Sequence, residues 1–181
     1  MLQGCQIGRQ IAGIALFYLY KLKPAMIDKR ALFDSLTKRI NEVLKGKANR
    51  DQKLKTVCRL LKENVPHYNW VGFYLVDKKK QNELVLGPFE GEPTEHVRIA
   101  FGKGICGQAA KLEKTFLVQD VSKETNYLSC SANVKSEIVV PIFNNRRIAG
   151  ELDIDSHSLS PFTKEDQTFL KKIAEMTSEL L

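Results

Sequence analysis

The segment EIVVPIFNNRRIAGELDID, residues 137–155, holds the pattern that decides the fold. Its first part, residues 137–143, is rich in β-branched residues, and Asn144-Asn145 is a turn signal before a second extended run at residues 147–155. A turn this short joins only antiparallel neighbours. The segment therefore predicts a β-hairpin inside an antiparallel sheet.

The second strand of this hairpin carries three carboxylates at alternate positions. Because side chains alternate between the faces of a strand, Glu151, Asp153 and Asp155 share one face, while Leu152 and Ile154 share the other. One interpretation is an ordinary solvent-exposed sheet face. The other is an acidic wall that binds a cation such as an ammonium group, since clustered like charges need a partner to stay ionised. Alternation alone leaves both interpretations open.

Outward from the hairpin, the apolar period switches between helix-like and strand-like stretches. Apolar residues recur at three- and four-residue intervals in three helical stretches, residues 28–44, 51–65 and 163–181, and a short helix is expected at residues 105–110 after a glycine-rich turn. Aromatic and β-branched residues mark further strands at residues 70–76, 83–86, 97–101 and 115–118, and Gly87-Pro88 is expected to end the second of these. The order predicts an α+β fold in which a six-stranded antiparallel sheet carries the long terminal helices on one face.

The four cysteines, Cys5, Cys58, Cys106 and Cys130, lie at wide and irregular spacings. The sequence has no CxxC pair and no cysteine–histidine pairing, so no metal site is expected. Four cysteines in 181 residues are also few for a disulfide-stapled secreted domain, which favours a reducing, cytoplasmic location. Cys58 falls in the apolar stripe of an amphipathic helix and is expected to be a small core residue.

Cys106 and Cys130 stand in contexts that favour reactivity. The glycine-rich stretch GKGICG, residues 102–107, lets the backbone turn into a short helix, so Cys106 lies near a helix N-terminus, which favours the thiolate. Cys130 lies inside a polar loop at residues 120–135, where core packing is a poor explanation for a cysteine. We therefore predict a thiol redox site.

The formal charge of +7 is spread along the chain and shows no recurring interleaving of basic and aromatic residues. Solvated surface lysines explain such a distribution. Neither a nucleic acid nor a membrane is therefore expected as a partner.

Residues 1–26 differ in composition from the rest of the chain. Their apolar run, residues 11–20, is shorter than the roughly 20 residues that span a bilayer, and Lys21 and Lys23 stand where a signal peptide would have its cleavage site. We interpret this segment in one of two ways. It is either an extension packed on the domain, or a stretch that follows an upstream start codon and is not translated because that codon is not used. Residues 27–181 are expected to form a single domain.

Five motifs characterise this domain. They are YNWVGFY (68–74), LVLGPF (84–89), GKGICG (102–107), SEIVVP (136–141) and LDIDS (152–156). In this order and spacing they resemble the free methionine-(R)-sulfoxide reductases, a family of single GAF-domain enzymes. The resemblance covers residues 27–181 and implies a six-stranded antiparallel GAF sheet, often dimeric, with a closed pocket for one free amino acid.

The resemblance also implies a role for individual residues. Cys130 matches the catalytic cysteine, and Cys106 matches a second cysteine that can form a disulfide with it. Trp70 and Tyr74 match the aromatic wall around the substrate methyl group. Three carboxylates match those that hold the substrate ammonium group and assist protonation of the sulfoxide oxygen: Glu137, Asp153 and Asp155. The implied reaction uses no cofactor or metal, only an external thiol reductant such as thioredoxin.

The sequence departs from the family pattern at residue 96. Many members have a third cysteine ten residues before the glycine-flanked one, and that cysteine often resolves the catalytic cysteine. Here the residue is His96, so resolution falls to Cys106 or to an external thiol, or activity has been lost. The alternative function is a non-catalytic GAF module that senses a small molecule, although a pocket lined by several acids would repel a nucleotide phosphate.

Overall fold

The structure is a computed structural model that describes residues 28–128 and 131–181. The predicted N-terminal extension, residues 1–26, and the predicted catalytic residue Cys130 lie outside the described residues. Within them, the order of elements is the predicted one: two helices, three strands, a short helix, three strands and a helix.

The six strands form one sheet in the order β3-β2-β1-β6-β5-β4, and every neighbouring pair is antiparallel. Their bounds are β1 Trp70–Val76, β2 Glu83–Glu90, β3 Arg98–Ala100, β4 Phe116–Val118, β5 Ser136–Asn144 and β6 Arg147–Ser156. The halves of the sheet meet where β1 pairs with β6, from Trp70–Asp155 to Leu75–Gly150. The predicted hairpin is β5–β6, and its acidic strand lies in the interior of the sheet.

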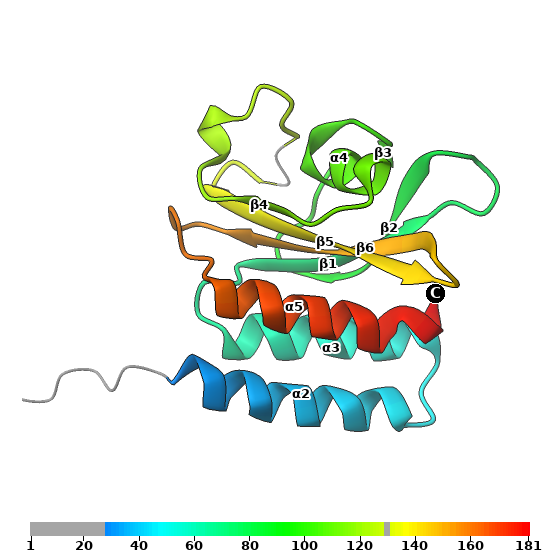
Figure 1. The fold of residues 1–181 in the computed structure, drawn as a ribbon, viewed down its shortest axis with the longest axis vertical. Helices are drawn as coiled ribbons and strands as arrows, with labels where there is room; N and C mark the ends of the chain where they lie inside the picture. Colours follow the sequence, from blue (N-terminus) through cyan, green and yellow to red (C-terminus); the bar gives the residue numbers. More distant parts are fainter. Residues whose placement is uncertain (1–27, 129–130) are drawn as a thin grey trace, which may run out of the picture.

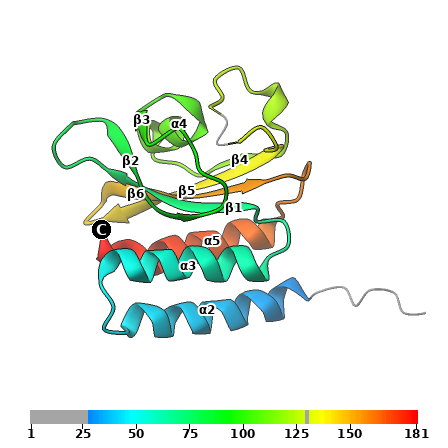
Figure 2. The ribbon, with the colours of Figure 1, turned by 180° about the vertical axis from the view of Figure 1, so that it is seen from behind.

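Helices lie on both faces of the sheet (Figure 1). Helices α3 (Arg50–Asn64) and α5 (Lys164–Thr177) cover one face, and α2 (Lys29–Lys45) forms an outer layer against them. Helix α4 (Gly104–Leu112) and the 3-10 helix η1 (Val121–Lys123), which follows β4, lie on the other face, as the view from behind also shows (Figure 2). The chain ends in a 3-10 helix, η2 (Ser178–Leu180). None of the described helices is long and apolar enough to cross a membrane.

Polar side chains fix where the three long helices begin. The Asp28 carboxylate accepts hydrogen bonds from backbone N–H groups in the first turn of α2. Asn49 and Gln52 form a reciprocal capping box at the start of α3. At α5, the Thr163 N–H donates to the Asp166 carboxylate over 2.8 Å. Such caps satisfy otherwise unpaired N–H groups, and each stabilises its helix by about 1 kcal/mol.

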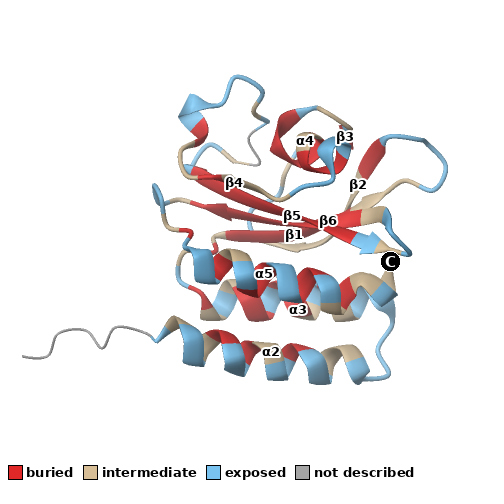
Figure 3. Ribbon diagram, in the orientation of Figure 1, coloured by how far each residue is buried: buried red, intermediate tan, exposed pale blue. Residues whose placement is uncertain are grey.

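The buried apolar residues form two clusters, and buried residues lie in the sheet and in the helices on both sides of it (Figure 3). The larger cluster fills the space between the sheet and α2, α3 and α5, and includes Leu36, Leu61 and Ile154. The smaller cluster lies between the sheet and α4, and contains Trp70 and Cys106. Trp70, Tyr74 and Cys106, which are predicted to carry chemistry, therefore lie on the α4 face, and the helical layers serve mainly to bury apolar surface.

Strand β2 corrects the prediction that Gly87-Pro88 ends a strand. The strand continues through both residues to Glu90. Between the Gly72–Phe89 and Tyr74–Leu86 pairs, β2 contains one residue more than β1, which is a bulge. Proline is tolerated at a bulge because it need not donate a ladder hydrogen bond there.

The hairpin turn also lies one residue later than predicted. Asn144 pairs with Arg147 as part of the ladder, so the turn residues are Asn145 and Arg146. Both have positive φ, 49° and 64°, as a type I′ turn requires. The ladder also contains a register shift between Ile142 and Phe143, and alternation in the sequence gave no sign of it.

Candidate functional site

Four carboxylates lie on one face of the β5–β6 hairpin. Glu137 pairs with Asp155 across the hairpin, and Asp153 and Glu151 follow at alternate positions of β6. All four side chains are between 0% and 2% exposed. The interpretation of this face as an ordinary solvent-exposed one is therefore wrong, and the acids line a covered site.

Helix α4 brings Cys106 to these acids. The Cys106 thiol lies 3.4 Å from Asp153 Oδ2 and 3.7 Å from Glu137 Oε1, and the residue is 4% exposed. The neighbouring Gly107 permits this close approach, because a Cβ there would lie 2.4 Å from the Ala100 carbonyl oxygen. The structure thus places the glycine-flanked cysteine against two of the predicted carboxylates.

Burial raises the pKa of three of the acids. For Glu137, burial acts most strongly and the neighbouring carboxylates add to it, so its pKa lies well above the usual value. Burial and the charge of Asp153 likewise raise the pKa of Glu151. Burial raises the pKa of Asp153 to about 7, against the opposing hydrogen bond from Cys106. Acids of this kind hold protons near neutral pH, which is the property that a general acid needs.

Strand β1 places the two predicted aromatic residues beside the acids. Trp70 pairs with Asp155 and Tyr74 pairs with Glu151, and cross-strand partners share one face of a sheet. The two rings are stacked with their centroids 6.3 Å apart. Trp70 Nε1 donates a hydrogen bond to the Glu92 carbonyl over 3.0 Å, which fixes the ring. An apolar wall and an acidic wall therefore meet at this site.

His96, the residue that departs from the family pattern, takes part through its backbone. The Tyr74 hydroxyl donates to the His96 carbonyl oxygen over 2.8 Å. The His96 N–H in turn donates to Thr94 Oγ1 over 3.2 Å. The position that often holds a resolving cysteine thus anchors Tyr74, and a backbone carbonyl does this whatever the side chain is.

Cys58 lies on the opposite face of the sheet, in the larger cluster, and is fully buried. Burial raises the pKa of its thiol, so it remains protonated at neutral pH. The prediction that Cys58 is a core residue is confirmed. Cys130, predicted to be the nucleophile, lies outside the described residues, so its role stays a prediction.

Glu151, which alternation placed in the predicted acidic wall, is the site residue that the family resemblance did not include among the functional carboxylates. It is fully buried, and neither carboxyl oxygen has a hydrogen-bond partner among the described residues. Buried polar atoms are nearly always paired, so this carboxyl requires an explanation. The signal was present in the sequence, because Glu151 shares the alternate positions of Asp153 and Asp155.

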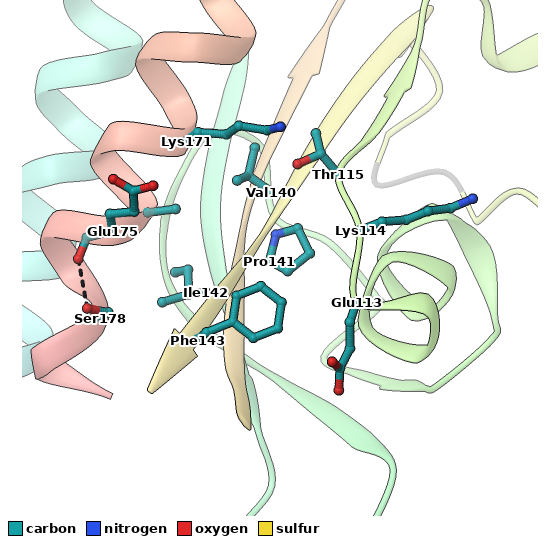
Figure 4. Close-up of a pocket in the computed structure, with 11 residues that line it drawn as sticks. Glu113, Lys114, Thr115, Val140, Pro141, Ile142, Phe143, Lys171, Glu175 and Ser178 are labelled. Carbon is teal, nitrogen blue, oxygen red and sulfur yellow. Dashed lines mark hydrogen bonds between the residues drawn. The ribbon is translucent and has the colours of Figure 1, made fainter. Parts of the chain in front are cut away.

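Two cavities help to locate the site. A cavity of about 390 Å³ is lined in part by Trp70 and by Ser131, so it opens beside the aromatic wall. A cavity of about 450 Å³ lies between α5 and the edge of β5, lined in part by Pro141 and Lys171 (Figure 4). None of the clustered acids or aromatic residues lines the second cavity, so the candidate site is not there.

Comparison with known proteins decides the family. The family model of the GAF domain matches residues 49–181. The GAF domain-containing protein A of Dictyostelium discoideum is 41% identical over 82% of this chain and 92% of its own length. A free methionine-R-sulfoxide reductase of Escherichia coli is 33% identical over 86% of this chain and 92% of its own length. The chain belongs to the free methionine-R-sulfoxide reductase family.

A solved structure of this reductase family has the same fold. The free methionine-R-sulfoxide reductase of Neisseria meningitidis, in complex with its substrate, superposes with a TM-score of 0.79 at 38% identity, covering 84% of this chain and 90% of that one. The predicted family and the predicted GAF fold are therefore confirmed. The roles of individual residues stay predictions.

Proposed function

We propose that this protein reduces free L-methionine-(R)-sulfoxide to methionine. The observation that carries the proposal is the contact of the Cys106 thiol with the buried carboxyls of Glu137 and Asp153, beside the aromatic wall of Trp70 and Tyr74. Relatives that carry the name free methionine-R-sulfoxide reductase support the choice of substrate. The rings suit the methyl and thioether part of methionine, and the acids suit its ammonium group.

The first chemical step is a two-electron exchange at sulfur. The Cys130 thiolate attacks the sulfoxide sulfur, and a protonated carboxyl of Glu137 or one of the aspartates gives its proton to the departing oxygen. The oxygen passes to Cys130, which becomes a sulfenic acid, and methionine leaves as the reduced thioether. The raised pKa values of Glu137 and Asp153 make either residue suitable as the proton donor.

The second step regenerates the cysteine. The Cys106 thiol attacks the sulfenic sulfur of Cys130, water leaves, and a disulfide forms. The nearby carboxyls are suited to take the thiol proton and return it to the leaving hydroxide. With histidine at position 96, Cys106 is the resolving residue that the sequence offers at this site. An external dithiol such as thioredoxin then reduces the disulfide.

The proposal extends to the setting of the enzyme. The protein works in the cytoplasm as a homodimer and uses no metal or other cofactor in turnover. The chain has four cysteines in 181 residues, too few for the disulfide framework of a secreted domain, and this supports a reducing compartment.

An NADPH-coupled assay with thioredoxin and thioredoxin reductase tests the function. We expect turnover of the free R sulfoxide, no turnover of the S form, and none of the R form after Cys130→Ser. Cys58→Ser is the matched control and keeps wild-type turnover, since Cys58 lies in the other cluster. Wild-type rates from the Cys130→Ser variant would contradict the proposed nucleophile. Absence of turnover with selective binding of another small molecule would instead favour a sensor.

A further inference from the structure

We propose that Cys106, Glu137 and Asp153 also form a binding site for a divalent cation of the Zn²⁺ class, and that this cation excludes the amino acid substrate. The thiol sulfur and one oxygen from each carboxyl all lie within 4.8 Å of one another. The site uses residues of the proposed substrate pocket, but the binding of a cation does not require the reductase activity.

The distances fit tetrahedral coordination. Zn–S bonds are about 2.3 Å and Zn–O bonds about 2.1 Å, so a tetrahedral angle puts the sulfur about 3.6 Å from each oxygen. The Cys106 Sγ lies 3.4 Å from Asp153 Oδ2 and 3.7 Å from Glu137 Oε1. A cation placed between these three atoms would therefore reach normal bond lengths with only small side-chain movements.

Glu151 provides an independent reason to expect a cation. Its carboxyl is fully buried, and neither oxygen has a hydrogen-bond partner in the described part of the chain. Glu151 stands two positions before Asp153 on β6, so both side chains lie on the same face of the sheet and the carboxyl of Glu151 belongs to the same cluster. Buried carboxylates are normally paired with a counter-charge or coordinate a metal. A divalent cation would supply that charge.

The donor set selects the type of cation. A thiolate with two or three carboxylate oxygens in a water-poor site suits Zn²⁺ and its close analogues Co²⁺ and Cd²⁺. Ca²⁺ takes six to eight oxygen ligands, and Mg²⁺ keeps several waters in an octahedral shell, so neither suits the sulfur or the small space. Cysteine spacing along the chain gave no sign of this set, because its ligands come from α4, β5 and β6.

Occupation by a cation has two chemical consequences. It holds Cys106 as a metal thiolate, which can no longer attack a sulfenic acid as a free thiol. It also occupies the carboxylates that are proposed to hold the substrate ammonium group. The metal-loaded protein is therefore inactive, and methionine sulfoxide and Zn²⁺ compete for the site.

Cobalt titration of the reduced full-length protein tests the site directly. One equivalent of Co²⁺ should bind with a sulfur-to-cobalt charge-transfer absorption that Zn²⁺ abolishes by displacement. The absorption should disappear in Cys106→Ser and persist in Cys58→Ser and Cys130→Ser. Equilibrium dialysis should show Zn²⁺ binding weakened at least tenfold by Asp153→Asn and by Glu137→Gln. Circular dichroism of each variant checks that it is folded, and the conservative changes keep the side-chain shape.

Each other outcome overturns the proposal. Absence of thiolate absorption, or an absorption that survives Cys106→Ser, shows that this site does not bind the cation. Binding of Zn²⁺ that free methionine-(R)-sulfoxide does not weaken overturns the competition. The cobalt and dialysis readouts do not use substrate or turnover, so they test the cation site separately from the proposed function. The competition with methionine-(R)-sulfoxide rests on the proposed function and fails with it.

Discussion

Glu151 shows at the scale of one residue how function constrains this sheet. Its carboxyl occupies a buried position on an interior strand, and its oxygens have no hydrogen-bond partner among the described residues. Leaving a buried polar group unpaired costs about 1–3 kcal/mol.

Replacing Glu151 with methionine should therefore stabilise the ligand-free protein. Methionine has a similar volume and no polar atoms, so we expect a gain of about 1–3 kcal/mol in the free energy of unfolding. Urea denaturation at pH 7 measures this change. Glu63→Met, on the exposed surface of α3, is the matched control and should change stability by less than about 0.5 kcal/mol. A lower free energy of unfolding in Glu151→Met than in wild type would show that the carboxyl makes stabilising hydrogen bonds, which contradicts the prediction.

Because of Asp153, the free energy of unfolding should decrease as the pH rises from about 4 to about 7. Its pKa is about 7 in the folded protein, against an ordinary value of 3.8, so the unfolded chain loses this proton first. Between about pH 4 and pH 7 the unfolded state binds fewer protons, and the free energy of unfolding decreases. The upper bound is about 4 kcal/mol, from roughly 1.4 kcal/mol per pKa unit.

The measurement is the free energy of unfolding of wild type and Asp153→Asn at several pH values. The advantage of the variant over wild type should grow from pH 4 to pH 7. Parallel profiles would show that Asp153 does not carry the raised pKa.

The sequence predicted the identity of most site residues but not their environment. Alternation showed that Glu151, Asp153 and Asp155 share a face, because that follows from strand geometry alone. Their burial depends on α4, which covers the hairpin although Cys106 of this helix precedes Asp153 by 47 residues. The contact between Cys106 and Asp153 has the same origin, so no local pattern could have revealed it.

At the scale of elements, Asp166 joins α5 to the outer layer. Its buried carboxylate accepts hydrogen bonds from Lys29 over 2.6 Å, from the Tyr68 hydroxyl over 3.0 Å and from Thr163 Oγ1 over 2.7 Å. Burial alone would raise the pKa of Asp166, but its hydrogen bonds, led by that of His67, bring it below the ordinary value. The network holds the first turns of α2 and α5 together.

Asp166→Asn should destabilise the protein by about 2–3 kcal/mol at pH 7. A fully buried ion pair costs roughly 3–5 kcal/mol to break, and Lys29 is partly solvated, which lowers the figure. Since the pKa of Asp166 is depressed, its contribution is present above pH 4 and is lost as the pH falls further. Thermal unfolding at pH 7 and at pH 2 measures this, with the exposed Asp34→Asn as control. An equal loss at both pH values would contradict an electrostatic role.

Strand β5 was predicted correctly although it contains a proline, and its open edge explains why the proline is tolerated. Pro141 lies inside β5, which would be unusual for an interior strand. However, β4 pairs only with residues 137–139, so the rest of β5 has an open edge beside the cavity shown in Figure 4. Proline on such an edge hinders unwanted pairing with another chain. Residue type predicted the strand, whereas its pairing depended on the short length of β4.

At the scale of the whole molecule, the two faces of the sheet have different roles. One face packs on the larger apolar core, and the other holds the candidate site. The larger apolar cluster lies against α2, α3 and α5, and the thiol, acids and rings lie against α4. The order of elements predicted this fold because successive strands with short connections favour antiparallel pairing. It could not predict which face would hold the site, since both faces of the central strands carry buried side chains.

The central claim is that Cys106 and Cys130 act as a redox pair on free methionine-(R)-sulfoxide. The most direct test is a single turnover of the reduced, metal-free protein without any reductant, followed by mapping of disulfides by mass spectrometry. We predict one methionine per chain from the R sulfoxide, none from the S form, and a Cys106–Cys130 disulfide in the product. Methionine formed without that disulfide would contradict the role of Cys106, and no methionine from either form would contradict the proposed function.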